Sequence, residues 1–206
     1  MVTVAIGRRE RAKTACRAQI IDAGIRLFGE RSIDAVTVDE IAAAADVGKG
    51  TIYNYFRTKE DIVVAFMADF ERKVHAKLRD LDSVNRTLAD TLTEFIRLQF
   101  QMKAPYHRFV RVFFAQMFLR TDQFLPHMAE IHQLTRSTTE ALFLALRKRR
   151  AIRADVDIND LTLVFNNMHL GLTALWAIEG PPFRATDYAL EREIALFCEG
   201  LEAKKR

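Results

Sequence analysis

The chain has 206 residues, of which 50% are hydrophobic and 28% charged, so a disordered polypeptide is excluded and a sizeable core is expected. The formal net charge of +4 is compatible with a polyanionic partner but is too small to indicate one by itself. The two cysteines, Cys16 and Cys198, suit neither a disulfide framework nor a CxxC metal or redox pair, which makes a reducing cytoplasm the expected location.

Apolar residues recur at spacings of three and four rather than two, which predicts an all-α protein with about nine helices and no sheet. A capping box, in which Glu40 follows Thr37 by three residues, predicts the start of a short helix. Thr58 is expected to cap a longer helix whose first turn carries acidic residues. The helices expected in this N-terminal part cover residues 11–31, 38–45, 49–56 and a segment from Thr58 onward.

Longer helices separated by breaking residues are expected in the remainder of the chain. They cover residues 85–102, a segment through Phe109 and Phe113 to about 120, a segment from Pro126 to 150, an uncharged segment at 161–178, and a last helix capped by Thr186. A shift in composition near residue 60 predicts two domains. We expect a DNA-binding domain over residues 1–60, including a basic N-terminal arm, and a larger helical domain over 61–206.

The two short helices are the most informative feature, because neither is long enough to be stable alone in water. Ile41, Ala42 and Ala45 on the first helix and Ile52 and Phe56 on the second form one apolar seam. Two short helices that cross over such a seam after a tight turn are typical of a helix-turn-helix unit. In that unit the second helix enters the major groove of DNA.

The outward side chains of this unit suit double-stranded DNA. Lys49, Gly50 and Thr51 lie at a helix N-terminus, which favours phosphate. Tyr53 and Tyr55 can donate to phosphates or contact thymine methyl groups, and Asn54 can pair with adenine edges. Tyr55 could instead cover the edge of the core, since it lies one turn from Ile52. The full set of expected DNA contacts is Thr37, Lys49, Gly50, Thr51, Tyr53, Asn54, Tyr55 and Lys59.

The same segment resembles the TetR family of transcriptional regulators. The resemblance lies in Ala23-x-x-x-Leu27-Phe28 and in Thr37-Val38-x-x-Ile41-Ala42-x-x-Ala45-x-Val47-x-Lys49-Gly50-Thr51-x-Tyr53-x-Tyr55-Phe56-x-x-Lys59-Glu60, and it spans about residues 11–62. It implies a homodimer that binds a palindromic operator, usually as a repressor, and releases it when a small molecule enters the C-terminal domain. Ser32 and Asp46 replace glycines that the family favours, and Asp tolerates the left-handed conformation such a turn needs.

The uncharged helix at 161–178 is apolar nearly all round, so it must be covered on several faces. Asn166, Asn167 and His169 in its middle argue against a membrane span, because hydrocarbon would leave their polar groups unpaired. We therefore expect no membrane association. With the final helix this segment is the expected dimer element, over about 158–179 and 186–203, as the family resemblance also implies.

The many phenylalanines of the larger domain predict a core and, for a subset, the walls of an apolar cavity with a few orienting polar groups. A hydrophobic or aromatic effector would suit such a cavity. The polar candidates could equally be satisfied core or interface residues. The candidate effector contacts are Phe95, Gln99, Phe113, Gln116, Met117, Asn166, His169 and Trp176.

The pattern as a whole predicts a ligand-responsive DNA-binding dimer and no enzyme. The sequence contains no P-loop, no GxSxG and no paired carboxylates suited to catalysis, so no cofactor is expected. His127 and His132 lack metal-ligand spacing, so no metal site is expected. The alternative is a DNA-binding protein without an effector that acts architecturally or through a protein partner.

Overall fold

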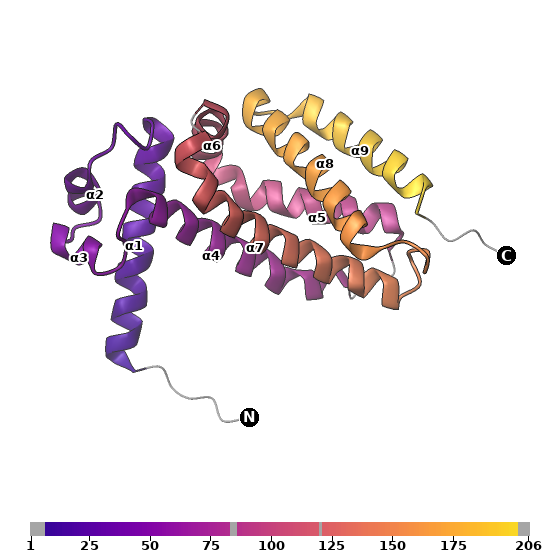
Figure 1. The fold of residues 1–206 in the computed structure, drawn as a ribbon, viewed down its shortest axis with the longest axis horizontal. Helices are drawn as coiled ribbons and strands as arrows, with labels where there is room; N and C mark the ends of the chain where they lie inside the picture. Colours follow the sequence, from indigo (N-terminus) through magenta and orange to yellow (C-terminus); the bar gives the residue numbers. More distant parts are fainter. Residues whose placement is uncertain (1–6, 83–85, 120, 202–206) are drawn as a thin grey trace.

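The computed structural model describes the backbone of residues 7–82, 86–119 and 121–201, and the side chains of residues 7–77, 86–117, 129 and 131–201. This described part is helical and contains no strand, which confirms the all-α prediction. Its elements, labelled in Figure 1, are α1 (Arg8–Glu30), α2 (Val38–Ala44), α3 (Lys49–Tyr53), α4 (Lys59–Asp82), α5 (Leu88–Lys103), the 3-10 turn η1 (Ala104–Tyr106), α6 (His107–Leu119), α7 (Thr121–Lys148), α8 (Ile158–Glu179) and α9 (Arg184–Glu199).

Local side-chain chemistry sets the N-terminal helix boundaries. The predicted capping box is present, with the Thr37 hydroxyl accepting from the Glu40 N–H at 3.2 Å and the Glu40 carboxylate accepting from the Thr37 N–H at 2.8 Å. The backbone hydrogen bond from Thr37, followed by the hydrogen bond from Arg31, lowers the pKa of Glu40 to about 2. Asp46 takes the left-handed conformation at φ 52°, so aspartate indeed serves where glycine is favoured.

Several predicted helix boundaries were wrong, among them the following three. The second short helix ends at Tyr53 rather than at residue 56, because the Asp61 carboxylate accepts from the Arg57 and Thr58 N–H groups and starts α4 there. The seventh helix begins at Thr121, so Pro126 lies inside this helix rather than at its start. The last helix begins at Arg184, and Thr186 lies inside it, where its hydroxyl donates to Glu179 at 2.7 Å.

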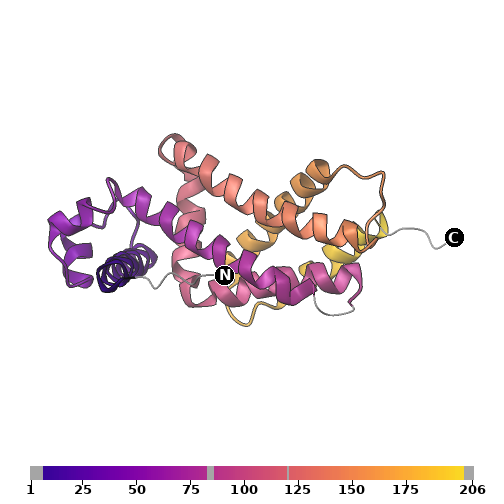
Figure 2. The same cartoon turned by 90° about the horizontal axis from the view of Figure 1, so that it is seen from below.

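Helices α1 to α3 form a small unit at one end of the molecule, and α5 to α9 form the larger helical part (Figure 1). Helix α4 starts beside the small unit and runs along α7 into the larger part, as the view from below in Figure 2 also shows. The predicted boundary at residue 60 therefore falls in the first turn of a helix that both parts share.

Helices α1 and α6 approach very closely. A Cβ atom added to Gly29 of α1 would lie 2.9 Å from the backbone nitrogen of Phe109 on α6, so only glycine allows this contact. The Arg17 guanidinium on α1 pairs with Asp69 on α4 at 2.9 Å. The small unit is thus joined to the larger part through α4 and through α6.

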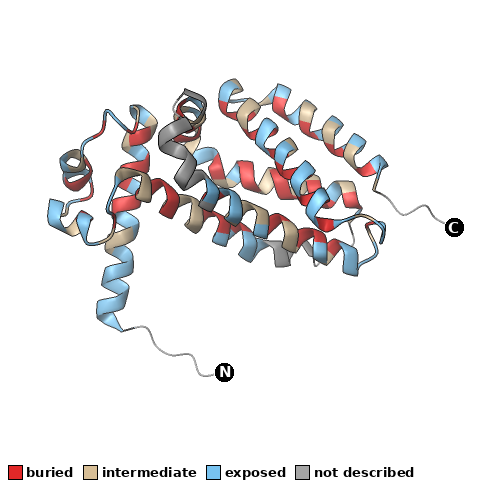
Figure 3. Ribbon diagram, in the orientation of Figure 1, coloured by how far each residue is buried: buried red, intermediate tan, exposed pale blue. Residues whose placement is uncertain are grey.

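Helix α8 is long and apolar enough to cross a membrane by length and composition alone, the one such helix within the described ranges, and half of its most apolar window is buried in the protein. Its inner face includes Phe165, Leu172 and Trp176, each at most 2% exposed. Figure 3 shows buried residues on the side of α8 that faces the bundle and exposed ones on the other side. The helix therefore behaves as a core helix with one open face.

Candidate DNA-binding surface and internal cavity

Helices α2 and α3 cross over the predicted apolar seam. Ile41, Ala42 and Ala45 are buried, as are Ile52 and Phe56. The Val47 N–H donates to the Ala42 carbonyl at 3.0 Å and closes the turn between the helices. Although Phe56 lies beyond the end of α3, its N–H still bonds to the Ile52 carbonyl at 2.9 Å and its ring stays in the seam.

The outer surface of α3 exposes the residues expected to contact DNA. Tyr53 is 52% exposed, Asn54 is exposed, and Thr51 is half-buried. A Cβ atom on Gly50 would meet nothing within 4 Å, so the backbone there is open to close approach. Lys49 is exposed and pairs with Asp39 at 2.9 Å, an interaction that raises the pKa of its ammonium group.

Besides Lys49, three of the expected contacts have other partners in the structure. The Tyr55 hydroxyl donates to the Lys13 carbonyl of α1 at 3.2 Å, and its half-buried ring contacts Phe56. The Lys59 ammonium donates to the carbonyls of Ile33 and Val36 at 2.7 and 2.8 Å and to that of Asp34 at 3.3 Å. Lys59 therefore fastens the loop before α2 to the start of α4. The Thr37 hydroxyl takes part in the capping box with Glu40.

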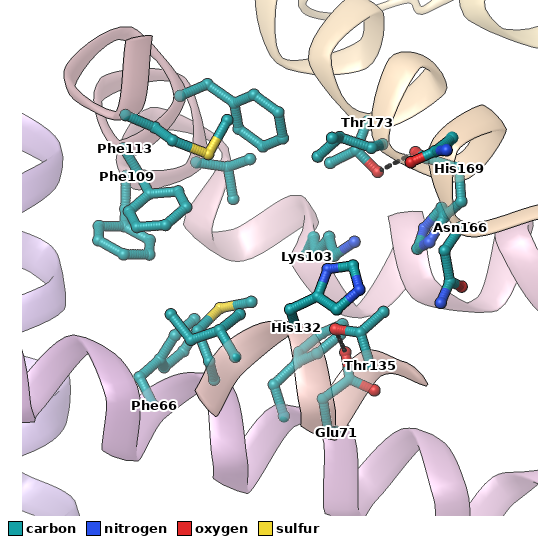
Figure 4. A pocket seen from close by; sticks show the side chains of 18 residues that line it. Phe66, Glu71, Lys103, Phe109, Phe113, His132, Thr135, Asn166, His169 and Thr173 are labelled. Atoms are coloured by element: carbon teal, nitrogen blue, oxygen red, sulfur yellow. Dashed lines mark hydrogen bonds between the residues drawn. The ribbon is translucent and has the colours of Figure 1, made fainter. Parts of the chain in front are cut away.

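A cavity of about 200 Å³ lies in the larger part of the molecule, between α4, α5, α6, α7 and α8. Figure 4 shows Phe66, Phe109 and Phe113 on one side of it and polar residues on the other, with Lys103 between them. His132, Asn167 and Leu170 also line the cavity and are exposed, so it opens to the surface beside α7 and α8.

The predicted effector residues divide into two groups. Phe113, Met117, Asn166 and His169 line the cavity. The other four do not line it and lie elsewhere in the core, where Phe95 contacts Phe165 and the Trp176 ring stacks between Phe100 and Phe183. The remaining two of that group are Gln99 and Gln116, both buried.

Two buried charged residues at the cavity were missed by the sequence analysis, Glu71 on α4 and Lys103 on α5. Burial raises the pKa of Glu71, against the opposing effects of Lys103, Thr138 and Thr135. Burial also lowers the pKa of Lys103 to about 8, although the Glu71 charge acts in the opposite direction. The burial of Lys103 had a signal in the sequence, because Lys103 continues the buried face of Leu92, Ile96 and Gln99 at helical spacing.

His169 adds a third buried polar group. Burial, helped by the Lys103 charge, lowers the pKa of His169 well below its usual value, so the ring is neutral. Its Nε2 atom has no hydrogen-bond partner within the described residues. Within the same residues no three His, Cys, Asp or Glu side chains lie together in a way that could hold a metal ion.

Exposed apolar side chains gather on α8 and α9, which lie side by side (Figure 1). Of the large hydrophobic residues that are exposed in the described part, all but Tyr53 and Leu144 belong to these two helices. They are Leu163, Val164, Leu170, Ile178, Tyr188 and Leu196. Ile178 is 75% and Tyr188 70% exposed.

A short second helix that exposes tyrosine, asparagine and lysine, on a unit joined to an all-helical body, defines a helix-turn-helix DNA-binding protein. Residues 20–66 match the family model described as "Bacterial regulatory proteins, tetR family". This match covers the helix-turn-helix part of the chain, which is therefore a DNA-binding domain of the TetR type.

Curated relatives of this chain are described as transcriptional repressors, and one solved structure shares its fold. The HTH-type transcriptional repressor KstR2 of Rhodococcus jostii (strain RHA1) is 24% identical over 147 residues, which are 71% of this chain and 72% of that protein. The HTH-type transcriptional repressor DhaR of Mycobacterium sp. (strain GP1) is 34% identical over 73 residues, which are 34% of this chain and only 37% of DhaR. The crystal structure of Thermus thermophilus FadR, a TetR-family repressor in complex with lauroyl-CoA, shares the fold with a TM-score of 0.69 and 22% identity, over 92% of this chain and 97% of that one.

Proposed function

We propose that the protein is a cytoplasmic repressor that binds a palindromic operator as a homodimer and leaves it when a hydrophobic small molecule occupies the internal cavity. The observation that carries this proposal is the exposed surface of α3, where Lys49, Tyr53 and Asn54 surround an open Gly50 backbone. Cationic and hydroxyl groups suit phosphates, and the asparagine amide suits adenine edges.

We propose fewer DNA-contacting residues than the sequence alone predicts. Lys49, Gly50, Thr51, Tyr53 and Asn54 remain the proposed DNA-contacting residues. Lys49 would exchange its exposed Asp39 partner for a phosphate, since an exposed ion pair contributes little stability. Tyr55 and Lys59 are proposed to hold the unit together, because both already bond to its backbone.

The proposed effector site is the cavity between α4 and α8. Its aromatic side suits an apolar molecule, and the FadR complex with lauroyl-CoA supports an acyl-type effector. The close contact at Gly29 offers a route for coupling, because α6 carries Phe109 and Phe113 of the cavity and also contacts α1.

DNA from the region flanking the gene, in a fluorescence anisotropy titration, tests operator binding. Tyr53→Ala and Lys49→Ala are each expected to lose operator binding while their thermal unfolding stays that of the wild type. Lys148→Ala, an exposed lysine at the far end of α7, is the matched control and should bind normally. Unchanged operator affinity in both α3 variants would show that α3 is not the DNA-binding surface.

Effector control is tested by adding a hydrophobic extract of the host cells to the DNA complex. Release of the DNA is the expected result, because the effector should favour a state that does not fit the operator. DNA binding that no fraction of the extract weakens would instead favour the alternative of a DNA-binding protein without a small-molecule effector.

A further inference from the structure

The Lys103 ammonium is buried at the cavity without a hydrogen-bond acceptor among the described residues. Lys103 is 9% exposed, and its ammonium group lies over the face of the Phe70 ring, 5.4 Å from the ring centre. The neighbouring acid, Glu71, forms no ion pair with it within 4 Å and instead accepts from the Thr135 hydroxyl at 3.2 Å. A buried charge without hydrogen bonds is costly, so an acceptor inside the cavity would be strongly favoured.

The surroundings of Lys103 divide the cavity into two chemically different parts. The wall of α4 and α6 is apolar and aromatic, and includes Phe66, Phe109 and Phe113. The opposite wall carries His169, whose Nε2 atom is also unpartnered, and Asn166, whose carbonyl accepts from Thr139 at 2.8 Å. In Figure 4 Lys103 lies between these walls, which is where the head of an amphipathic ligand would sit.

The size of the cavity limits the ligand further. At about 200 Å³ it is smaller than the usual pocket for a drug-sized molecule, and a cavity of about 150 Å³ is known to hold benzene. A single ring or a medium-length chain therefore fits inside, whereas a nucleotide-sized group does not. The group that pairs with the buried Lys103 ammonium must then belong to the compact part of the ligand that lies inside the cavity.

We infer that the cavity binds a compact hydrophobic carboxylic acid, with its carboxylate on the Lys103 ammonium and its apolar part among the phenylalanines of α4 and α6. This inference rests on the proposed function in taking the cavity as the effector site. It differs from an acyl-CoA ligand, in which the carboxylate has been converted to a thioester and the negative charge lies on the distant nucleotide.

The experiment is isothermal titration calorimetry of the protein without DNA, near neutral pH. The probes are octanoate and 3-phenylpropanoate, each beside its matching alcohol, and octanoyl-CoA. At least one acid is expected to bind about tenfold or more tightly than its alcohol, since hydrogen bonds to charged groups are worth that much. Lys103→Met should remove this preference while the alcohol affinity changes little, and Lys77→Met, an exposed change on α4, should keep it.

A second variant keeps the test informative if Lys103→Met does not fold. Glu71→Gln removes the competing carboxylate near Lys103 and is expected to tighten binding of the acid severalfold without affecting the alcohol. Three results would overturn the inference: neither acid binds, the acid and alcohol bind equally, or octanoyl-CoA binds more tightly than octanoate regardless of Lys103. Binding of the acid with the expected preference but without any effect on operator DNA would refute effector control and leave the inference standing.

Discussion

Lys49, Lys59 and Lys103 carry the same side chain, but their ammonium groups meet different surroundings. Lys49 is exposed beside Asp39, Lys59 is held by three backbone carbonyls, and Lys103 is buried beside aromatic rings. Sequence spacing predicted DNA contact for the first two alike. Because the Lys59 ammonium already bonds to backbone carbonyls, we propose a structural role for it.

Replacement of Lys59 tests that distinction. Lys59→Met leaves the carbonyls of Ile33, Asp34 and Val36 without their donor, so we expect a loss of about 1–3 kcal/mol in the free energy of unfolding. Urea denaturation followed by circular dichroism measures it, with Lys77→Met as an exposed control on the same helix. Wild-type stability combined with lost operator affinity would show that Lys59 is a DNA contact after all.

The buried position of Lys103 predicts a specific dependence of stability on pH. Its pKa is about 8 in the folded protein and 10.5 in the unfolded chain, so between these values the unfolded chain binds more protons. Raising the pH from about 8 to about 10.5 should therefore stabilise the fold, by up to roughly 3 kcal/mol from this residue. Urea denaturation across this range checks the effect.

Lys103→Met is the matched variant for this pH experiment, because it removes the titrating group and keeps most of the length of the side chain. Other lysines and tyrosines titrate in the same range in both proteins, so only the difference between them reports on Lys103. Identical pH profiles for the two proteins would contradict the buried, charged state of Lys103.

At the scale of elements, α6, like α4, touches both the DNA-binding unit and the cavity. Its first turns contact α1 at Gly29, and its phenylalanines line the cavity. A shift of α6 along or away from α1 would therefore displace α1, the helix on which the helix-turn-helix unit is built. Such coupling needs an element with two arrangements, and α6 is positioned to provide it, as is α4.

Gly29→Ala tests the importance of this contact. The added Cβ would lie 2.9 Å from the Phe109 backbone nitrogen, which cannot rotate away as a side chain would, so α1 and α6 must separate. We expect about 1–3 kcal/mol lower stability and a changed sensitivity of operator binding to effector, despite the better helix propensity of alanine. Differential scanning calorimetry and anisotropy titration measure the two effects.

Gly50→Ala is the control for this change, because a Cβ atom there meets nothing within 4 Å. Its stability should equal or exceed that of the wild type, so a loss confined to the Gly29 variant assigns the effect to the α1–α6 contact. Equal stability of the two variants would mean that α6 adjusts freely and that this contact does not constrain it.

The elements that the sequence predicted well are those set by neighbouring residues. The capping box of Thr37 and Glu40 and the left-handed turn at Asp46 depend on a few local atoms, and both are present. The end of α3 was wrong because Phe56 fits a helical apolar pattern, whereas its ring reaches the seam from a turn governed by Asp61. The spacing of apolar residues indicates which side chains are buried, but it does not show whether the backbone that carries them is helical.

The cavity was only half predictable for a related reason. Phe113, Met117, Asn166 and His169 follow from residue chemistry, but Phe95 and Trp176 have the same chemistry and fill the core. Which aromatic ring faces a space and which fills one is decided by the crossing of several helices. Glu71 and Lys103 were missed because charged residues on long helices are usually solvated, and the helical spacing of Lys103 does not by itself show that its ammonium group is enclosed.

At the scale of the whole molecule, the exposed apolar face of α8 and α9 calls for a partner that covers it. A soluble monomer rarely exposes a large continuous apolar patch, and a palindromic operator needs two helix-turn-helix units related by a twofold axis. A second copy of the chain satisfies both requirements at once. The proposed homodimer therefore places Leu163, Val164, Ile178, Tyr188 and Leu196 at its interface.

Ile178→Glu tests this assembly, because a carboxylate buried in an apolar interface has no partner and costs several kcal/mol. Ile178 is 75% exposed in the single chain, so the substitution should not disturb the fold of the protomer. Sedimentation equilibrium should show a dimer for the wild type and a monomer for the variant, with operator affinity reduced at least about tenfold, since one unit then contacts one half-site. Leu144→Glu, a similar change at an exposed leucine of α7, should remain dimeric and bind DNA normally. If Ile178→Glu stays dimeric while Leu144→Glu dissociates, the interface lies on α7 and the twofold arrangement proposed for α8 and α9 is wrong.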